Sequence, residues 1–260
     1  MLNDVNLQKY EEMQAMIFAA GLGTRLKPLT DTMPKALVKV GGKTLLEQVT
    51  RKLAVAGAGR MVVNVHHFAG QIEDFLRSND NFGQDIAISD ESGQLLDTGG
   101  GLRKAQGLFS GNEPILIHNV DILSNVDLRA FYEQGRQNDA TLLVSKRETA
   151  RYLLFDKDMR LVGWTNIKTG EVRSPYKDID PKHCTMLAFA GIHAFAPRLF
   201  PLMDGFPDKF GIMDFYISVC HKAVIKGVVA DGLKLLDVGK VESLAAAEQF
   251  MEEIIINKTE

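Results

Sequence analysis

The sequence predicts an α/β protein built on a doubly wound, mostly parallel mixed sheet with a small antiparallel insertion. Short apolar runs alternate with longer segments of helical periodicity through the first half of the chain, and this alternation is typical of α/β proteins. The segments between the runs are long enough for crossover helices, which favours parallel pairing of the strands. Two short apolar runs separated by a turn in the second half predict the antiparallel insertion.

The first half of the chain alternates expected strands and helices. Apolar residues at 45, 46, 49, 53 and 56 share one face of a helix over 44–56, which separates strands over 15–19 and 61–65. The pattern continues with two helices and two strands, over 71–76, 102–109, 85–89 and 115–118. Most neighbouring strands are therefore joined through a helix.

The second half begins with a strand over 141–146, followed by a hairpin whose strands cover 152–155 and 160–164. The remaining elements are a long strand, a helix, a short strand and a terminal helix, over 186–195, 212–225, 234–236 and 241–256. No linker rich in proline, glycine or serine divides the chain, so we expect one domain over residues 1–260.

Composition and charge exclude several functional classes. The 260 residues are 45% hydrophobic and 24% charged, and the net charge of -3 lacks the basic excess of a general nucleic-acid binder. Cys184 and Cys220 have no C-x-x-C spacing, so neither a disulfide framework nor a zinc ribbon is available. The N-terminal residues lack the apolar stretch of a signal peptide or membrane span. We therefore expect a cytoplasmic protein that binds neither nucleic acid nor membranes.

The segment 18–40 leaves the first expected strand through a glycine turn and then carries several cations. Glycines let backbone N–H groups approach phosphate oxygens, so the turn predicts an anion site. A dinucleotide-binding fingerprint would need glycine where Leu26 stands, so that interpretation is weak. A P-loop ending at residues 42–44 would need glycine where Leu37 stands, so that interpretation is rejected.

The same segment resembles the signature of the sugar-1-phosphate nucleotidylyltransferases, the family that makes nucleoside-diphosphate sugars. The positions that match G-x-G-T-R-L-x-P-L-T and its following P-K are Gly21, Gly23, Thr24, Arg25, Leu26, Pro28, Leu29, Thr30, Pro34 and Lys35. So many fixed positions directly after a strand are improbable by chance. The resemblance covers about residues 16–250, is strongest to short bacterial members that serve the cell envelope, and implies the nucleotide-diphospho-sugar transferase type of fold.

The resemblance also implies which part of the chain binds each substrate. It predicts a nucleotide-binding half over about 15–140, a sugar-phosphate-binding half over about 141–240 and a C-terminal helix over 241–257. In the family the signature arginine and lysine grip the triphosphate and the attacked phosphoryl group, which assigns catalytic roles to Arg25 and Lys35. Nucleotide binding is assigned to Ala19, Ala20, Gly21, Gly23, Thr24, Thr98, Gly99 and Gly100.

The last three of these residues belong to a glycine cluster that opens the expected helix over 102–109. Glycines at a helix N-terminus offer bare N–H groups to a ligand. In the family the corresponding segment lies against the base and ribose. Asp97 before the cluster is expected to be a helix cap.

Asp121 and Asp237 each follow an apolar run at the carboxyl end of an expected strand, where an open α/β sheet places its ligands. Judged from the residues alone, a helix cap and a metal ligand are equally good interpretations of each aspartate. The family's N-G-D and D-x-G motifs supply two metal carboxylates, and residues 119–121 and 237–239 match them. The resemblance thus implies Mg²⁺ as cofactor, held by Asp121 and Asp237.

Two departures from the family pattern concern the sugar site. Val120 replaces the usual glycine, and the Glu-Lys-Pro motif that contacts the sugar and its phosphate is missing from its place around residues 164–166. We expect the sugar to be bound by Asn119, Val120 and Gly191, the last because a small residue lets the ring approach. The cation that replaces the missing lysine is expected to be Arg151, with Arg147 as the alternative.

The implied reaction is attack by a sugar-1-phosphate oxygen on the α-phosphate of a nucleoside triphosphate, which releases pyrophosphate and forms an NDP-sugar. The second pKa of a phosphate monoester lies near about 6, so this nucleophile needs no general base. The expected partners are therefore a nucleoside triphosphate and a sugar-1-phosphate. The hexapeptide repeats of longer relatives are absent, so we expect a monomer or small homo-oligomer, and the identity of the base stays open.

Two other functions compete with this one. The chain could be a cytidylyltransferase for phosphocholine or a similar phosphorylated alcohol, which would need an aromatic and acidic pocket for a quaternary ammonium. It could also be a nucleotide-sugar sensor without turnover. The presence of Arg25, Lys35, Asp121 and Asp237 makes the sensor the weaker option.

Overall fold

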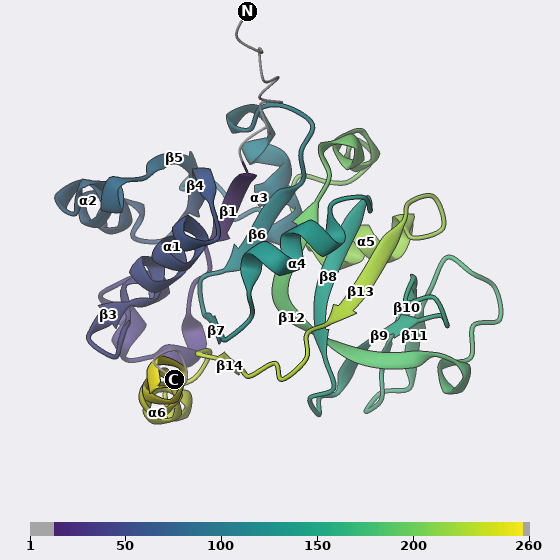
Figure 1. Ribbon diagram of the computed structural model, residues 1–260. Helices are drawn as coiled ribbons and strands as arrows, with labels where there is room; N and C mark the ends of the chain where they lie inside the picture. Colours follow the sequence, from purple (N-terminus) through teal and green to yellow (C-terminus); the bar gives the residue numbers. More distant parts are fainter. Residues whose placement is uncertain (1–12, 257–260) are drawn as a thin grey trace, which may run out of the picture.

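A ten-stranded mixed sheet runs through the computed structural model, which describes residues 13–256 (Figure 1). The strand order is β11-β10-β9-β12-β6-β1-β4-β5, and β8 lies beside β12 with β13 beyond it. The strands of the first half are parallel to one another, as the crossover pattern predicts: β1 (Met13–Phe18), β4 (Ala58–Val65), β5 (Asp85–Asp90) and β6 (Ile115–Asn119). Their carboxyl ends therefore meet at one edge of the sheet.

Helices cover both faces of this sheet, which confirms the doubly wound fold. One face buries apolar side chains from α1 (Leu45–Val55), α2 (Ala69–Ser78), α4 (Leu128–Gly135) and α6 (Glu242–Ile256). The other face buries those of α3 (Asp97–Ala105) and α5 (Ile212–Val219). Among the described residues, no helix combines the length and the apolar character needed to cross a bilayer.

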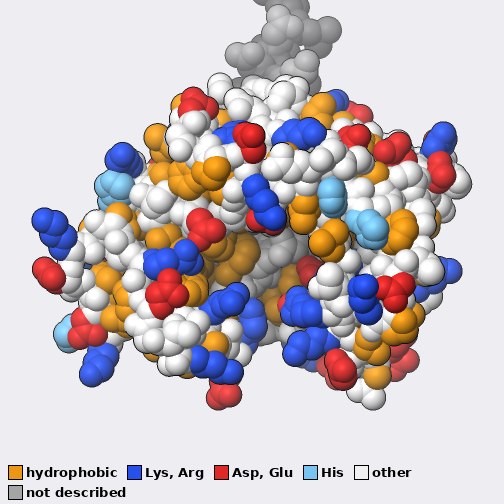
Figure 2. All heavy atoms as spheres, turned by 180° about the vertical axis from the view of Figure 1, so that it is seen from behind, with side chains coloured by type: hydrophobic (Ala, Val, Ile, Leu, Met, Phe, Trp, Pro, Cys, Tyr) orange, Lys and Arg blue, Asp and Glu red, His pale blue; other side chains and the backbone are white. Residues whose placement is uncertain are grey.

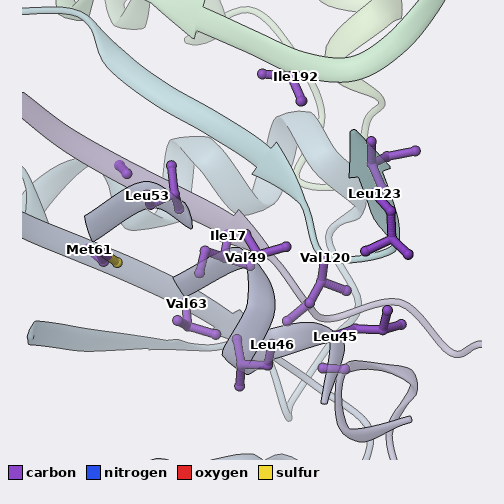
Figure 3. Close-up of a cluster of buried hydrophobic side chains, with 14 of the residues drawn as sticks. Ile17, Leu45, Leu46, Val49, Leu53, Met61, Val63, Val120, Leu123 and Ile192 are labelled. Atoms are coloured by element: carbon purple, nitrogen blue, oxygen red, sulfur yellow. The ribbon is translucent and has the colours of Figure 1, made fainter. Parts of the chain in front are cut away.

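The α1 side of the core shows why its residues form a helix there. The Thr44 side chain accepts a hydrogen bond from the Glu47 N–H and so caps the first turn. The apolar positions Leu46, Val49 and Leu53 then pack onto the strands, where they meet residues such as Ile17 and Val63 (Figure 3). Val120 and Leu123 extend this core towards the carboxyl edge of the sheet.

The antiparallel part of the sheet is organised around β12 (Thr185–Phe195). Its first residues pair with β9 (Arg151–Phe155), and its later residues pair with β6 and β8 (Ala140–Ser145). The predicted hairpin is present, since β9 is antiparallel to β10 (Leu161–Asn166), and β11 (Glu171–Arg173) adds a third strand. One long strand therefore connects the parallel sheet to the insertion.

The expected helix over 212–225 is wrong in its second half. Helix α5 ends at Val219, and Ile225–Val229 forms β13, which is parallel to β8. The segment is mostly apolar, so periodicity alone could not separate a buried helix from a buried strand. The β-branched residues of β13 complete the sheet where β8 would otherwise be an exposed edge.

Four short strands lie outside the main sheet, in two pairs. The hairpin of β2 (Lys39–Val40) and β3 (Lys43–Thr44) precedes α1, and β14 (Leu235–Asp237) pairs with β7 (Ile122–Ser124). The strand expected over 234–236 is therefore present, but it belongs to a two-stranded sheet of its own. This small sheet brings β14 beside the segment that follows β6.

Candidate active site

A cavity of about 540 Å³ opens at the carboxyl edge of the parallel strands. Figure 2 shows this face hollowed, with Lys and Arg side chains gathered around the hollow. Residues from the signature segment, from the ends of β4 and β6 and from the start of α3 line it: Phe18, Ala19, Ala20, Gly21, Leu22, Gly23, Thr24, Arg25, Lys35, Asn64, Glu91, Leu95, Asp97, Thr98, Asn119, Val120, Asp121, Gly211 and Gly239. Most residues predicted for the site therefore share one cavity.

The signature segment folds back on itself so that its two cations reach this cavity. Gly23 adopts a left-handed conformation with φ of 63°, which a side chain would strain. Its carbonyl accepts a hydrogen bond of 2.8 Å from the hydroxyl of the buried Thr30. Arg25 follows in a short 3₁₀ turn, and Lys35 begins another. Gly23 and Thr30 of the motif thus have a structural reason to be where they are.

Lys35 and Asp121 form an ion pair at the base of the cavity. Lys35 is 8% exposed and belongs to the signature, whereas Asp121 lies in the turn between β6 and β7. A lysine this buried needs a charged partner, because an unpaired charge would lose its hydration without compensation. The pair therefore fixes the signature segment against the end of the sheet.

Asp237 joins this pair through the backbone of the next residue. The Val238 N–H donates to the Asp121 carbonyl at 2.8 Å, which holds the end of β14 beside the turn after β6. Burial, followed by the charge of Asp121, raises the pKa of Asp237, while Lys35 and Arg25 act in the opposite direction. Two carboxylates and two cations therefore lie within electrostatic reach of one another.

Gly239 leaves the space in which Arg25 approaches Asp237. A Cβ atom built on Gly239 would lie 2.7 Å from Asp237 Oδ1 and 3.0 Å from Arg25 Nη2. The D-x-G spacing thus has a direct physical meaning, because any side chain at 239 would separate the carboxylate from the guanidinium.

The donor set fits a hard divalent cation. Asp121 and Asp237 supply carboxylate oxygens, and burial, followed by the charge of Asp121, raises the pKa of Asp237. Among the described residues no cluster of three or more His, Cys, Asp and Glu side chains could enclose a metal by itself. Two carboxylates are enough for Mg²⁺, which takes one or two from the protein and completes its shell with phosphate oxygens and water.

A buried polar network in the lining of the cavity was not predicted from the sequence. Asn64 accepts the Ala19 N–H at 2.8 Å and donates to the Glu91 carboxylate at 2.6 Å, and Glu91 also accepts the Leu96 N–H at 3.1 Å. Burial raises the pKa of Glu91. Asn64 in β4 and Glu91 just after β5 stand at the carboxyl ends of their strands, so the rule that singled out Asp121 could have found them.

Contrary to the prediction from the sequence, the glycine cluster after Asp97 does not offer free N–H groups to a ligand. The helix begins at Asp97, so Gly99 and Gly100 lie inside its first turn. Their N–H groups both donate to the Phe210 carbonyl, at 2.9 and 3.2 Å, and so are not bare. Asp97 is not a side-chain cap, whereas Thr98 lines the cavity and accepts the Ile212 N–H at 3.0 Å. The glycines instead allow α3 to pack tightly against the segment before α5.

Replacing Gly99 with alanine tests this packing role. The new Cβ would lie 2.4 Å from the Phe210 ring, so we expect a loss of about 1–3 kcal/mol in the free energy of unfolding. Urea denaturation measures the loss. Gly107→Ala is the matched control, since a Cβ there would have no atom within 4 Å. Equal stability of the two variants would contradict the packing role.

The predicted sugar-site residues Asn119, Val120 and Gly191 lie close together. Gly191 has φ of 76° at a bulge in β12, and a Cβ atom there would lie 2.7 Å from Ile122 and 3.1 Å from the Asn119 amide. Gly191 is therefore small because protein side chains approach it, and it does not itself line the cavity. Val120 does line the cavity, although it is only 4% exposed.

Val120→Gly tests whether this side chain narrows the cavity. Removing the isopropyl group is expected to broaden the range of accepted sugar-1-phosphates and to cost roughly 2–4 kcal/mol of stability. Relative kcat/KM values across a panel of acceptors measure the first effect. Val120→Ala keeps backbone restraint and isolates the loss of volume. An unchanged profile in both variants would make Val120 a packing residue alone.

The structure separates the two arginines expected to replace the missing lysine. Arg151 begins β9 in the insertion, where it stands opposite Asn166 of β10, and it does not line the cavity. Arg147 follows β8, and its charge is one of those that lower the pKa of Asp237. Trp164, at the place of the missing motif, packs against the Arg173 guanidinium instead. Arg147 does not line the cavity either, so the structure brings neither arginine into it.

The fold and this cluster of cations and carboxylates define an enzyme that transfers a nucleotidyl group. The chain belongs to the nucleotidyl transferase family, whose model matches residues 14–153. This match covers the signature segment, the glycine cluster and Asp121, and it confirms the resemblance drawn from the sequence.

Individual relatives agree with this membership. N-acetylmuramate alpha-1-phosphate uridylyltransferase of Caulobacter vibrioides is 32% identical over 249 residues, which cover 92% of this chain and 97% of that protein. The enzyme of the same name from Neisseria meningitidis serogroup B is 41% identical over 121 residues, 46% of this chain and 52% of that protein. HddC from Yersinia pseudotuberculosis, solved with GMP-PN, shares the fold with a TM-score of 0.72 at 21% identity and covers 92% of this chain and 99% of its own.

Proposed function

We propose that this nucleotidyltransferase transfers UMP from UTP to N-acetylmuramate 1-phosphate, forming the UDP-sugar and pyrophosphate. The observation that carries the reaction class is that Arg25, Lys35 and Asp121 line a single cavity and that the charges of all three act on Asp237 beside it. The choice of base and acceptor is supported by the Caulobacter relative, to which the chain is similar over 97% of that protein's length.

The residues of the site suit a direct displacement between two anions. The acceptor phosphate is mostly dianionic at neutral pH, because its second pKa is about 6, so it attacks the α-phosphate without a general base. Accordingly, no histidine lines the cavity among the described residues. His118 and His193 are fully buried, and burial lowers the pKa of each to about 3. Both imidazoles are therefore neutral parts of the core.

Arg25 and Lys35 reduce the repulsion between the triphosphate and the acceptor and hold the α-phosphate for in-line attack. Asp121 and Asp237 would hold Mg²⁺, which supplies charge neutralisation at the phosphate oxygens. The Lys35–Asp121 ion pair keeps one cation and one carboxylate in a fixed relation before substrate arrives. Preorganisation of this kind lowers the cost of binding a polyanion.

We place the reaction in the cytoplasm and assign it no nucleic-acid partner. Both cysteines are free thiols, which suits a reducing compartment. The net charge of -3 argues against a polyanion-binding surface beyond the cavity itself. A monomer or small homo-oligomer is consistent with a cavity that is lined by one chain.

The test is pyrophosphate release with Mg²⁺ across a grid of nucleoside triphosphates and phosphorylated acceptors. We expect release with UTP and N-acetylmuramate 1-phosphate and dependence on both. Release only with CTP and phosphocholine would support the cytidylyltransferase alternative. Silence throughout, together with calorimetric binding of UDP-sugars, would favour the sensor.

A further inference from the structure

Asn64 and Glu91 form a hydrogen-bonded pair in the lining of the cavity that the transfer reaction does not use. Asn64 is 3% exposed and Glu91 is 1% exposed, yet both line the cavity. The Asn64 amide nitrogen donates to the Glu91 carboxylate at 2.6 Å. A Cβ atom built on Gly101 of α3 would lie 2.5 Å from this carboxylate and 3.0 Å from the amide nitrogen. Helix α3 therefore leaves just enough space for the pair.

The Asn64–Glu91 pair connects two separate segments of the cavity lining. The Asn64 side-chain oxygen accepts the N–H of Ala19, where the signature segment begins, at 2.8 Å. The second Glu91 oxygen accepts the N–H of Leu96 at 3.1 Å, shortly before the cavity-lining residue Thr98. Both ends of the amide and both oxygens of the carboxylate are therefore in use. A change in either side chain breaks the connection between the two segments.

The order of the strands places this pair at the nucleoside end of the cavity. Most of the groups assigned to the phosphates and to Mg²⁺ follow β1 and β6, whereas Asn64 lies at the end of β4 and Glu91 directly follows β5. The order β6-β1-β4-β5 and the usual strand spacing put the end of β5 about 14 Å from the end of β6. None of the described lining residues from β4, from α3 or from the segment between β5 and α3 is a cation. This part of the cavity therefore suits the uncharged nucleoside and not the triphosphate.

We propose that Asn64 and Glu91 are positioning residues that fix the width of the nucleoside site and so select a pyrimidine base over a purine base. The inference rests on the proposed transfer from UTP. The base then lies between the signature turn, held through Ala19, and the segment around Thr98, held through Leu96. A base with two rings would have to push these segments apart and break buried hydrogen bonds, which leaves polar groups unpaired in a partly dry site.

Glu91→Gln and Asn64→Asp each break the pair with almost no change in volume. In Glu91→Gln the new amide nitrogen faces another donor, and in Asn64→Asp two carboxylates face each other. We expect either variant to raise the KM for UTP about tenfold or more, while the KM for the acceptor changes by less than about twofold. The ratio of kcat/KM for UTP to that for GTP should fall about tenfold, because the freed segments admit the larger base. Initial rates at varied nucleotide and acceptor concentrations measure both effects.

The double variant Asn64→Asp/Glu91→Gln restores the pair with its acid and amide exchanged. The new aspartate accepts the Ala19 N–H and the glutamine amide, and the glutamine oxygen accepts the Leu96 N–H. It should recover most of the UTP affinity and of the base selectivity. Gln14→Ala is the matched control, since the Gln14 amide makes buried hydrogen bonds to the Ser110 backbone at the other end of β1. It should lower the melting temperature and leave the selectivity unchanged.

Three results would overturn the assignment: an unchanged KM for UTP in both single variants, an equal loss for UTP and GTP, or a double variant no better than the single ones. Calorimetry with UTP and with GTP, in Mg²⁺ and without acceptor, makes the same comparison without turnover. If the wild-type enzyme prefers UTP but the variants keep its selectivity, only this inference fails. If it prefers another pyrimidine nucleotide, the proposed substrate is wrong and the comparison made with that nucleotide still decides the role of the pair. A preference for GTP would contradict both proposals.

Discussion

Asp121→Asn is expected to lower kcat by roughly 1000-fold or more, since a metal carboxylate contributes several kcal/mol to phosphoryl transfer. The asparagine keeps a hydrogen-bond acceptor for Lys35 but loses the charge that pairs with this buried ammonium. We therefore also expect a lower melting temperature, in addition to the lost turnover. Pyrophosphate release and thermal melting measure the two effects.

Asp237→Asn separates metal binding from stability. Burial and Asp121 raise the pKa of Asp237, so its ionised form is unfavourable in the folded chain without metal, and removing the charge should not lower the melting temperature in EDTA. Its turnover should nevertheless fall as far as that of Asp121→Asn. Near-normal activity in either folded variant, with an unchanged dependence on Mg²⁺, would move the metal site elsewhere.

Arg25→Ala should reduce kcat/KM for the nucleotide by several orders of magnitude, on the order of 10³-fold. The guanidinium lies beside Asp237 and Gly239 in the cavity, so it can neutralise charge on the triphosphate, and its exposure means that the fold does not depend on it. Initial rates at varied nucleotide concentration give the effect, and Arg25→Lys should recover only part of it.

Lys27→Ala provides the control for Arg25. Lys27 is exposed, pairs with Asp31 on the surface and stands at a position that the signature leaves open. It should therefore keep wild-type kinetics. If Arg25→Ala matched this control, the triphosphate role would belong to another cation.

The parts of the site that could be predicted are those whose residues lie close together in the sequence. Gly23, Arg25, Thr30 and Lys35 lie within one short segment, and the Thr30–Gly23 hydrogen bond shows that this segment largely determines its own shape. Asp121 was predictable for a related reason, because an apolar run marks the end of β6 and a parallel sheet collects its ligands there. The signature motif was sufficient to predict the first group of residues. The rule that ligands lie at the carboxyl ends of parallel strands was sufficient to predict Asp121.

Other parts of the site depend on contacts between distant segments. The Asn64–Glu91 hydrogen bond exists because β4 and β5 are neighbours in the sheet, and the sequence alone does not state which strands pair. The amides of Gly99 and Gly100 are occupied because Phe210 packs over them from more than a hundred residues away. A glycine cluster has the same appearance in a sequence whether its N–H groups face a ligand or a carbonyl.

The two candidate arginines, Arg147 and Arg151, also show that local sequence does not state which distant segments are in contact. Both are arginines beside one predicted hairpin, and nothing in their local sequence ranks them. Arg147 follows β8 and donates a hydrogen bond to the Phe189 carbonyl in β12, whereas Arg151 lies in β9 opposite Asn166 of β10, and neither lines the cavity. Local sequence therefore predicted the family, which the comparisons confirm, and the candidate phosphate-binding segment and metal carboxylates. Pairing of remote strands established which further side chains share their cavity, because electrostatic and packing interactions depend on distance in space and not on separation along the chain.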